Sequence, residues 1–504
     1  MAKKKAIIIG AGIGGLATAA ILSKAGYEVK VLEKNEQIGG RAAQLITDGF
    51  IFDMGPSWYL GPDIFSNFFK LLDEDIDQHL KIVKLDPAYR IFYKDTNLSL
   101  DITANPTENL KRISQLDPTA KRWLPDYLDK AEFQYTTAIN KFLHKNYDSI
   151  TDFFNWDVIK NGYKLSLFQK MDRYTKKFTK NENVQKLLQY PLVFLGSSPY
   201  NTPALYSLLS HMDLTQGVFY PLGGIKAVAD ALANIAKKHG AEIFCDQEVT
   251  KINVNNEQIA TEVELNNGQK IAADLIVSNG DIEHTENKLL SPEYQSYSKK
   301  YWKTRVIAPS GFIMFLGVKG KLPQLSHHNL VFCKDWPTNF KEIFDQPKLP
   351  GDPSFYVCMP SKTEPNVAPE NCENIFVLVP VAANMELTES QIENYGEQIL
   401  ETMSTSMQIN DLKERIIYKS YFTGEDFKSR YHSFGGSALG LAHTLGQTAI
   451  FRPNNQSKKV KNLYYVGGNT NPGIGVPMCL ISAELVYKRL KKDKSAQPLT
   501  KINE

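Results

Sequence analysis

The pattern of apolar and polar positions changes its period within the first 35 residues. Residues 6–9 are a continuous apolar run, which is typical of a strand buried in a parallel sheet. Residues 16–26 then favour a helix that ends at Gly26, and residues 27–33 favour a second strand that ends at Glu33. Strand, helix and strand in this order predict a βαβ unit.

Between about residues 60 and 210, apolar and aromatic residues recur at three- and four-residue spacing, which predicts helices. The runs 64–72, 153–160 and 163–180 show this spacing. One side of a helix over 163–180 would carry Leu165, Phe168, Met171, Tyr174 and Phe178. Most of its remaining surface would carry Lys164, Lys170, Arg173, Lys176, Lys177 and Lys180. The helix either packs on the core with a solvated basic side or rests on anionic lipid.

Residues 217–279 return to strands and helices in alternation. A short strand, a Gly-Gly turn, a helix and a strand are predicted over 217–244. Residues 248–272 alternate around two turn sequences and predict a three-stranded antiparallel excursion, after which 273–279 rejoin the main sheet. A second sheet is predicted from strands at 311–320, 354–360, 375–383 and 415–423, with a helix at 389–407.

Composition excludes several classes of protein. The chain has 504 residues, which is more than one ordinary core holds, and 58 basic against 55 acidic residues leave a net charge of only +3. We therefore expect no nucleic-acid partner. No apolar run approaches the roughly 18 residues of a membrane span, because glycines interrupt the one near the N-terminus. We expect neither a signal peptide nor a membrane crossing.

The cysteines and histidines do not indicate a metal centre. Five scattered cysteines without metal-ligand spacing favour reduced thiols in a cytosolic protein. His327 and His328 are neighbours on a predicted strand, where successive side chains point to opposite faces. We expect the two rings to point apart and to lack a third ligand, so we predict no metal site.

The glycines that follow the opening strand are the first indication of a ligand-binding site. Gly10, Gly12 and Gly15 have the spacing G-x-G-x-x-G, and Gly14 adds a fourth glycine. Such glycines allow a tight turn, a close approach to a pyrophosphate and close helix–strand packing, and the helix N-terminus offers free N–H groups to phosphate. Glu33 is placed to accept hydrogen bonds from ribose hydroxyls and disfavours a 2′-phosphate. These residues predict dinucleotide binding, with NADP disfavoured.

A second glycine pair and an arginine follow soon after the acid. Gly39, Gly40 and Arg41 suit a dianionic pyrophosphate. Together with residues 48–59 (DGFIFDMGPSWY), this turn resembles the FAD-binding pattern shared by amine oxidases, dissociation inhibitors of Rab proteins and carotenoid desaturases. The resemblance implies that chain around Trp58 passes near the flavin ring and that the backbone of Val249 touches adenine.

A more specific resemblance involves residues 196–236 and 463–486 (LYYVGGNTNPGIGVPMCLISAELV). With the N-terminal segment, they are similar over essentially the whole chain to the bacterial phytoene-desaturase-type family of FAD-dependent carotenoid desaturases and oxidases. The resemblance implies that LYYV forms a strand beside the first strand. A helix that begins at Val476–Met478 would then point its N–H groups at the flavin's pyrimidine end. Met478 departs from the family, where many relatives carry glycine.

The pattern and the resemblance together assign FAD as the cofactor and leave the catalytic residues unknown. The implied cofactor contacts are Gly10, Gly12, Gly14, Gly15, Glu33, Lys34, Gly40, Arg41, Pro56, Ser57, Trp58, Val249, Gly467, Gly468, Val476 and Met478.

The family resemblance also implies a reaction. We expect a carotenoid desaturase that transfers a hydride from an acyclic or partly acyclic polyene to flavin N5. In the branch that we favour, the reaction is at the 3,4 bond of a 1-hydroxycarotenoid. Phytoene or diapophytoene desaturation, oxidation of a terminal methyl group and polyene isomerisation stay open. So do a flavin-free prenyl-chain binding protein and a soluble amine oxidase. The electron acceptor would be a quinone or oxygen, and the protein would lie on the inner face of the cell membrane, in the cytoplasm.

The predicted fold class is α/β, with a Rossmann-like FAD-binding domain of the amine-oxidase and dissociation-inhibitor type. We assign residues 1–70, 215–289 and 430–495 to this discontinuous domain. The inserted residues 71–214 would form a helical region at the membrane and the substrate entrance. Residues 290–429 would form the mixed sheet and helices of the substrate domain.

Overall fold

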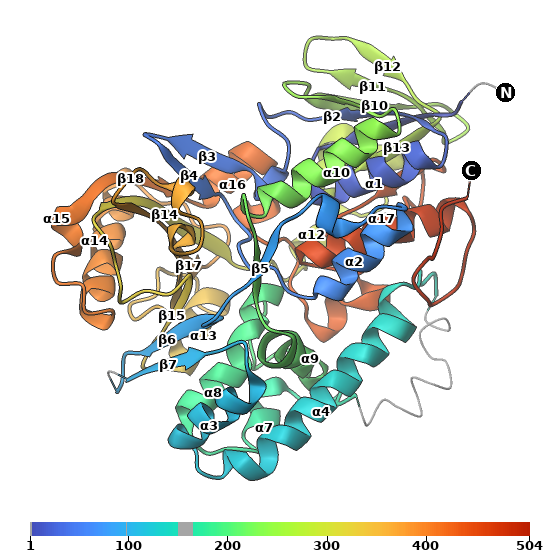
Figure 1. Cartoon of the computed structure of the whole chain (residues 1–504). Helices are drawn as coiled ribbons and strands as arrows, with labels where there is room; N and C mark the ends of the chain where they lie inside the picture. Colours follow the sequence, from blue (N-terminus) through green and yellow to red (C-terminus); the bar gives the residue numbers. More distant parts are fainter. Residues whose placement is uncertain (1–2, 97, 150–164, 504) are drawn as a thin grey trace.

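Five parallel strands form the sheet at which distant parts of the chain meet (Figure 1). The computed structural model describes residues 3–96, 98–149 and 165–503. The strand order is β19–β13–β1–β2–β9, and every neighbouring pair is parallel. The strands are β1 (Lys5–Ile9), β2 (Glu28–Leu32), β9 (Glu242–Phe244), β13 (Leu275–Ser278) and β19 (Leu463–Tyr465).

Both faces of this sheet are buried, as the apolar run of β1 predicts. Ala6 and Ile8 pack on one face among three helices, and Ile7 and Ile9 pack on the other face against a small antiparallel sheet. The helices are α1 (Ile13–Lys24), α10 (Lys226–Lys238) and α17 (Val476–Leu490). The small sheet contains β10 (Val249–Val254), β11 (Ala260–Leu265) and β12 (Lys270–Ala272). The predicted βαβ unit, the antiparallel excursion and the final helix are therefore confirmed.

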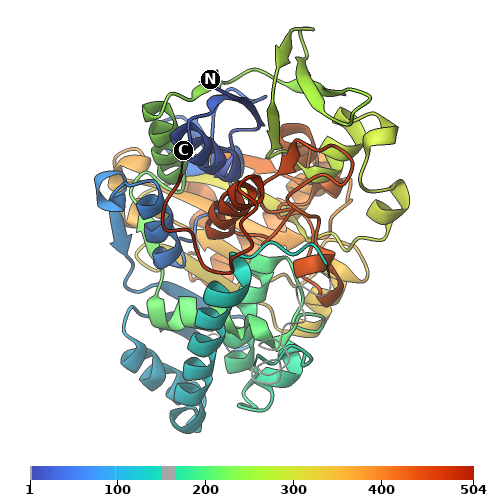
Figure 2. The ribbon, with the colours of Figure 1, turned by 90° about the vertical axis from the view of Figure 1, so that its right-hand side faces the viewer.

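The last strand occupies a different place from the one expected. Residues 463–466 were predicted to lie beside the first strand, but β19 pairs with β13. Both edges of β1 are already taken by β2 and β13, so β19 can join the sheet only at its outer edge. Figure 2 shows that α17, which follows β19, returns to the middle of the molecule beside the N-terminal segment.

A second sheet of seven strands has the order β18–β14–β17–β16–β15–β6–β7. All its pairs are antiparallel except β15 with β6. The strands are β6 (Tyr89–Tyr93), β7 (Leu98–Ile102), β14 (Ser310–Lys319), β15 (His328–Phe332), β16 (Phe355–Cys358), β17 (Cys372–Val381) and β18 (Ile416–Phe422). The helices and short hairpins around it are α13 (Trp336–Phe344), α14 (Glu389–Ser406), α15 (Leu412–Arg415), α16 (Gly424–Tyr431), β3 (Gln44–Thr47) with β4 (Phe50–Asp53), and β5 (Ile82–Lys84) with β8 (Phe219–Pro221).

The sheet over 311–423 was predicted, but its extension into residues 71–214 was not. The predicted helical character of 71–214 is incomplete, because β6 and β7 lie within this range and join the sheet through β15. The pairing of β6 with β15 joins residues more than 230 positions apart, and local periodicity does not reveal such a partner.

Helices form most of the remaining described part of residues 71–214, at the lower end of Figure 1. The helices of this region are α3 (Pro106–Leu116), α4 (Ala120–Ala138), α7 (Met171–Thr175), α8 (Glu182–Gln189) and α9 (Leu208–His211). α2 (Pro62–Leu71) leads into the region, and α11 (Ile282–His284) and α12 (Lys299–Lys303) lie between β13 and β14. The run 153–160 lies outside the described residues. No helix in the described ranges is long and apolar enough to cross a membrane.

The continuous helix predicted over 163–180 is wrong within the described residues. Only Met171–Thr175 is helical, because Ser166 has a positive φ of 54° and Lys170 is extended and bridged to Pro203. Met171 is buried, whereas Phe168 is 86% exposed. The apolar residues of this segment therefore do not share one face of a helix.

Candidate active site

One cavity of about 1220 Å³ extends from the carboxyl ends of the parallel strands to the seven-stranded sheet. It exceeds the roughly 300–1,000 Å³ of ordinary ligand pockets, so it has room for more than one extended molecule. Every predicted cofactor contact except Gly15 lines it, namely Gly10, Gly12, Gly14, Glu33, Lys34, Gly40, Arg41, Pro56, Ser57, Trp58, Val249, Gly467, Gly468, Val476 and Met478. The structure thus brings residues from both ends of the chain to one place.

Gly15 has a different role, which its spacing also predicts. A Cβ at Gly15 would lie 2.1 Å from the carbonyl oxygen of Gly10, so glycine is required for α1 to pack on β1. A Cβ at Gly14 would lie 3.2 Å from Cα of Gly467, and one at Gly40 would lie 3.2 Å from Cα of Gly12. Three glycine turns from distant parts of the sequence therefore approach one another with no side chains between them.

Asn279 occupies the small space that these turns leave. A Cβ at Gly14 would lie 2.6 Å from its Oδ1, and one at Gly12 would lie 2.8 Å from its Nδ2. The sequence reasoning did not single out Asn279 or Asp281, which follow directly after β13. Their position after a parallel strand could have identified them as site residues, because ligands bind at the carboxyl ends of such strands.

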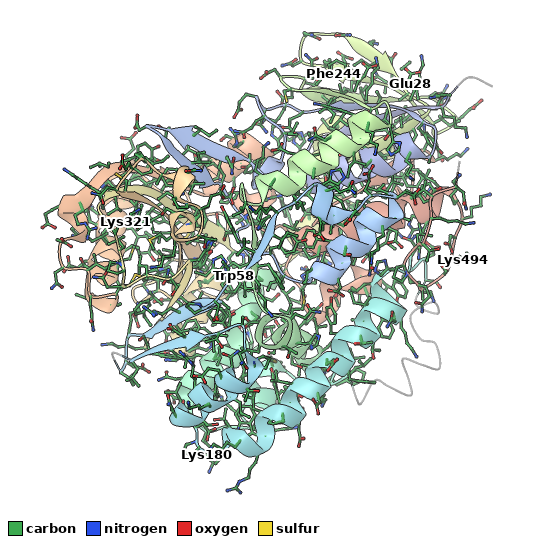
Figure 3. The ribbon with its side chains drawn as sticks, viewed as in Figure 1. Glu28, Trp58, Lys180, Phe244, Lys321 and Lys494 are labelled. Atoms are coloured by element: carbon green, nitrogen blue, oxygen red, sulfur yellow. The ribbon has the colours of Figure 1, made fainter. Side chains whose placement is uncertain are left out.

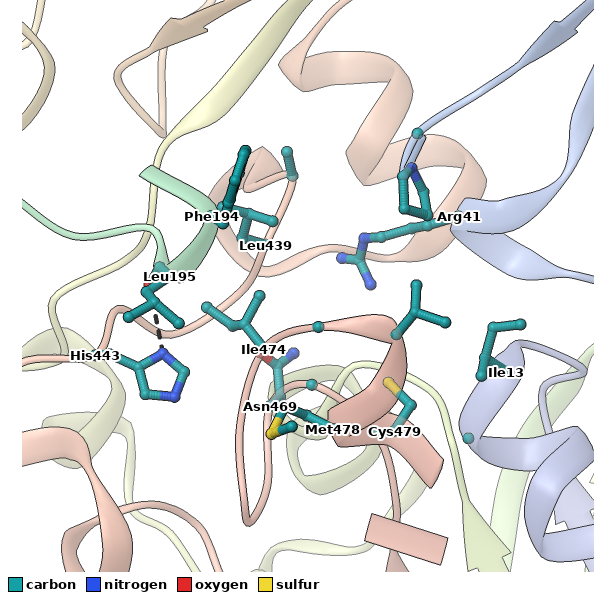
Figure 4. A pocket seen from close by; sticks show the side chains of 18 of the residues that line it. Ile13, Arg41, Phe194, Leu195, Leu439, His443, Asn469, Ile474, Met478 and Cys479 are labelled. Carbon is teal, nitrogen blue, oxygen red and sulfur yellow. Dashed lines mark hydrogen bonds between the residues drawn. The ribbon is translucent and has the colours of Figure 1, made fainter. Parts of the chain in front are cut away.

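The charges in this part of the cavity favour an anion. Nη2 of Arg41 donates a hydrogen bond to Ser433 Oγ at 2.6 Å, and its buried Nε has no partner among the described residues. Figure 4 shows the guanidinium extending toward the middle of the cavity, opposite Phe194. The N-terminus of α1 has no side-chain cap, so its N–H groups add a second anion-binding element.

The acid that ends β2 is buried beneath the glycine turn. Oε2 of Glu33 accepts a hydrogen bond from the Ala11 N–H at 2.7 Å, and Oε1 accepts one from the Asn35 N–H at 2.9 Å. Oε1 also accepts a hydrogen bond from Asn35 Nδ2 at 2.7 Å, so Oε2 is the oxygen that retains a lone pair for a ribose hydroxyl. Lys34 Nζ donates to the carbonyl oxygen of Ser429 at 2.7 Å, which ties this end of the cavity to α16.

The far half of the cradle is the N-terminus of α17. Gly475 precedes it with a φ of 128°, and no side chain caps the helix. The structure records no protein acceptor, within the ranges described above, for the N–H groups of Val476 and Met478. Met478 and Cys479 stand at this helix start in Figure 4. The helix start is therefore a second site that favours negative charge.

Aromatic side chains line the other end of the cavity around Trp58, which lies near the middle of the molecule in Figure 3. The indole stacks on the ring of His328 with centroids 4.6 Å apart, and the ring centroids of Tyr89 and Phe194 lie 5.2 and 5.3 Å from it. The hydroxyl of Tyr356 joins Ser57 Oγ at 2.7 Å and His328 Nδ1 at 2.6 Å. This end of the cavity suits a long apolar molecule.

The geometry expected for the histidine pair is wrong. His327 precedes β15 and is not part of it, so the two rings do not alternate across a strand, and their centroids lie 4.5 Å apart. A third candidate ligand is also present, because Cys358 Sγ lies 3.7 Å from His328 Nδ1. Each Nδ1 already has a hydroxyl partner, Thr363 for His327 and Tyr356 for His328. Burial lowers the pKa of both histidines, so both rings are neutral.

Comparison with known proteins identifies the family. A family model described as flavin-containing amine oxidoreductase matches residues 13–486. The chain belongs to this family. It is 42% identical over 487 residues to a carotenoid 3,4-desaturase of Haloarcula japonica, with 96% of this chain and 98% of that protein covered. A ζ-carotene-forming phytoene desaturase of Myxococcus xanthus is 31% identical, with 98% and 95% covered. The chain thus falls in the carotenoid-desaturase group of this family.

A solved structure shows the same fold at much lower identity. An oxidoreductase from Methanosarcina mazei has a TM-score of 0.61 and 19% identity, with 96% of this chain and 100% of that chain covered. The predicted α/β architecture of the amine-oxidase type is therefore confirmed. The family match over residues 13–486 makes the protein a flavoprotein oxidoreductase.

FAD, the cofactor of this flavoprotein, fits the residues that the cavity offers. The unpartnered Nε of Arg41 and the uncapped start of α1 suit its phosphates, and Glu33 suits a ribose. The uncapped start of α17 suits the flavin ring, which becomes negative on reduction. The roles of the individual residues remain predictions. The fit nonetheless removes the reason for a flavin-free binding protein.

A buried carboxylate stands behind the aromatic end of the flavoprotein's cavity. Asp213 Oδ2 accepts hydrogen bonds from the hydroxyls of Tyr89 and Tyr190, both at 2.8 Å, while its Oδ1 is buried without a partner among the described residues. Burial raises the pKa of Asp213 to about 7, although the two tyrosine hydroxyls favour the ionised form. Tyr190 itself lines the cavity. Sequence reasoning missed Asp213, because its burial follows from contacts with distant segments.

Proposed function

We propose that this protein desaturates a carotenoid at the 3,4 bond of an acyclic end that carries a 1-hydroxyl group. The aromatic end of the cavity, lined by Trp58, Tyr190, Phe194, Phe332, Trp336 and Tyr356, is the observation that carries the proposal, because a polyene offers only apolar surface to its binding site. The choice of bond is supported by the 42% identity to a protein named carotenoid 3,4-desaturase.

When bound, FAD supplies the acceptor for a hydride from an allylic carbon of the polyene. The protein's part is to hold that carbon against the flavin and to exclude water. Trp58 is well suited to this, because its ring is fixed by stacking on His328 and by contacts with Tyr89 and Phe194. The negative charge that reduction places on the flavin would face the uncapped start of α17.

Removal of the proton from the neighbouring carbon involves Tyr190 and Asp213 in this proposal. The C–H electron pair becomes the new double bond, and the proton passes to the hydroxyl oxygen of Tyr190. The proton that Tyr190 already donates to Asp213 Oδ2 moves to that carboxylate, so the tyrosine stays neutral. A delocalised polyene cation is a strong acid, so a weak acceptor of this kind is sufficient.

The substrate reaches the cavity from lipid in this proposal, and the protein lies peripherally on the inner face of the cell membrane. Phe168 and Phe451 line the cavity and are 86% and 52% exposed, so its wall presents large apolar side chains to the surroundings. Lys176 and Lys177 lie close by in sequence and are exposed, which suits anionic headgroups. A membrane quinone could use the same route as electron acceptor, and oxygen is the alternative.

The test uses the FAD-loaded protein in liposomes that contain single carotenoids. We expect a 1-hydroxylated acyclic carotenoid to gain a longer chromophore, and phytoene and diapophytoene to react more slowly or not at all. Oxygen in the product would mean a terminal oxidase, and no reaction with any polyene would refute the proposal. The variant with Phe168→Ser and Phe451→Ser should bind liposomes at least tenfold more weakly, whereas Ile417→Ser, at a residue that is 57% exposed on β18, should bind normally.

A further inference from the structure

Arg452 is a buried cation that forms no ion pair with any of the residues that the structure describes. Its side chain is almost fully enclosed, with 3% of the residue exposed. No carboxylate oxygen lies within ion-pair distance of it in the described ranges, whereas the similarly buried Lys186 and Lys488 face Asp95 at 3.2 Å and Glu484 at 3.6 Å. An uncompensated buried charge is costly, so some other group must offset it.

All the hydrogen bonds recorded for Arg452 go to backbone carbonyl groups. Nε donates to Thr470 at 3.1 Å and Nη2 donates to Gly468 at 2.6 Å, both in the turn that follows β19. Nη2 also donates to Leu441 at 3.1 Å, and Nη1 donates to Gln447 at 3.4 Å. The guanidinium therefore braces two loops but keeps its whole charge. Burial lowers the pKa of Arg452 only to about 10, so the charge persists at neutral pH.

This charge lies one peptide behind the wall of the cofactor cavity. Gly468, whose carbonyl accepts the shortest of these bonds, lines the cavity, and so do Asn469 and His443. Figure 4 shows His443 on the side of the cavity away from Arg41, with Asn469 between them. Burial, assisted by the charge of Arg452, lowers the pKa of His443 to about 3, so this ring is neutral. Arg452 thus places a positive charge directly behind the cavity wall at Gly468, whereas Arg41 lies in the cavity near the N-terminal glycine turns.

We propose that Arg452 is a positioning and electrostatic residue that stabilises the negatively charged reduced flavin and so raises the flavin's reduction potential. When a C–H bond of the substrate breaks and its electron pair leaves with the hydrogen as hydride, the flavin gains one negative charge. A positive charge held behind the Gly468 peptide in a low-dielectric wall favours that product over the neutral oxidised ring. This inference rests on FAD in the cavity and is independent of which polyene reacts.

The experiment compares Arg452→Gln, Arg452→Lys and wild-type holoprotein. Sulfite adds to oxidised flavin and leaves a negative charge on the ring, so its dissociation constant reports this field without any substrate. We expect Arg452→Gln to raise the sulfite dissociation constant at least tenfold and to lower the two-electron midpoint potential by about 30 mV, which corresponds to tenfold in the equilibrium. Arg452→Lys keeps the charge but loses most of the carbonyl contacts, and should stay within threefold of wild type.

Lys488→Gln is the matched control, because it also removes a buried cation that donates to carbonyl groups, at His144 and Ser495, but outside the cavity wall. It should leave both flavin measurements unchanged. An unchanged Arg452→Gln protein, or equal losses in Arg452→Gln and Arg452→Lys, would reduce Arg452 to a structural brace. If Arg452→Gln retains no FAD, the test uses the wild-type holoprotein alone. The pKa of its bound reduced flavin should be lower than the pKa of free reduced FAD, and equal pKa values would overturn the proposal.

Discussion

The buried carboxyl group of Asp213 makes a quantitative prediction about stability and pH. Its pKa is raised from 3.8 to about 7 in the folded protein, mainly by burial. Between these values the folded protein holds a proton that the unfolded chain releases, so stability falls as pH rises from about 4 to about 7 and is constant above that. Three pKa units at about 1.36 kcal/mol each give a full effect of about 4 kcal/mol, of which about 2 kcal/mol falls between pH 5.5 and pH 8.

Asp213→Asn removes this titration and keeps a side chain of the same shape. The hydrogen bond that the variant loses to Tyr89 or Tyr190 is lost equally at both pH values, so it cancels when the pH difference is compared. For a chain of 504 residues, about 2 kcal/mol corresponds to a difference of about 2 °C in Tm. Relative to wild type, the variant's Tm should therefore be about 2 °C higher at pH 8 than at pH 5.5.

Thermal unfolding of the holoprotein at the two pH values is the assay, followed by flavin fluorescence and circular dichroism. Asp129→Asn, at an exposed position on α4, is the control and should leave the wild-type pH dependence unchanged. If Asp213→Asn and wild type lose the same Tm between pH 5.5 and pH 8, the carboxyl group is ionised in the folded protein. The reasoning about its burial would then be refuted, whereas the proton transfer from Tyr190 would stand, because it requires an ionised carboxylate.

Three further predictions concern the cofactor and the catalytic step. Gly14→Ala should raise the dissociation constant of FAD at least tenfold in a fluorescence titration, because its Cβ would lie 3.2 Å from Cα of Gly467. Gly351→Ala is the control, because its added Cβ would have no atom within 4 Å. Met478→Gly should speed reoxidation of the reduced flavin by oxygen in stopped flow, since a side chain leaves the cavity wall; an unchanged rate would contradict this. Tyr190→Phe should slow flavin reduction by the polyene at least tenfold without weakening FAD binding, and an equal loss of both would indicate a structural role.

The sequence predicts the FAD half of the fold well because its signals are local. The apolar run of β1, the glycines after it and the acid at the end of β2 lie within 33 residues, and each constrains the next. Partners that come from far along the chain were missed or misplaced. β6 joins β15 over more than 230 residues, and β19 lies beside β13 because β1 has no free edge.

The same distinction applies to the site. Several predicted contacts have an unusual backbone, such as Gly40 and Gly467, and glycine at a turn is visible in the sequence. Asp213 and Arg452 were not found, because their importance depends on burial and on the absence of an ion partner, which only the folded chain determines. Asn279 was also missed, although its position directly after a parallel strand could have indicated a site residue.

The cofactor site also explains why the two ends of the chain must be tested by substitution and not by truncation. Removing the last 45 residues should abolish FAD binding, but the result would be hard to interpret. That deletion would remove β19 from the sheet edge and α17 from its place against α1, so the protein would lose buried structure as well as cofactor contacts. Gly14→Ala perturbs a place where backbone from both ends of the chain approaches closely, at Gly467, and leaves both segments present. A loss of FAD affinity in that variant, with an unchanged fold, would therefore show that one cofactor is held jointly by the beginning and the end of the chain.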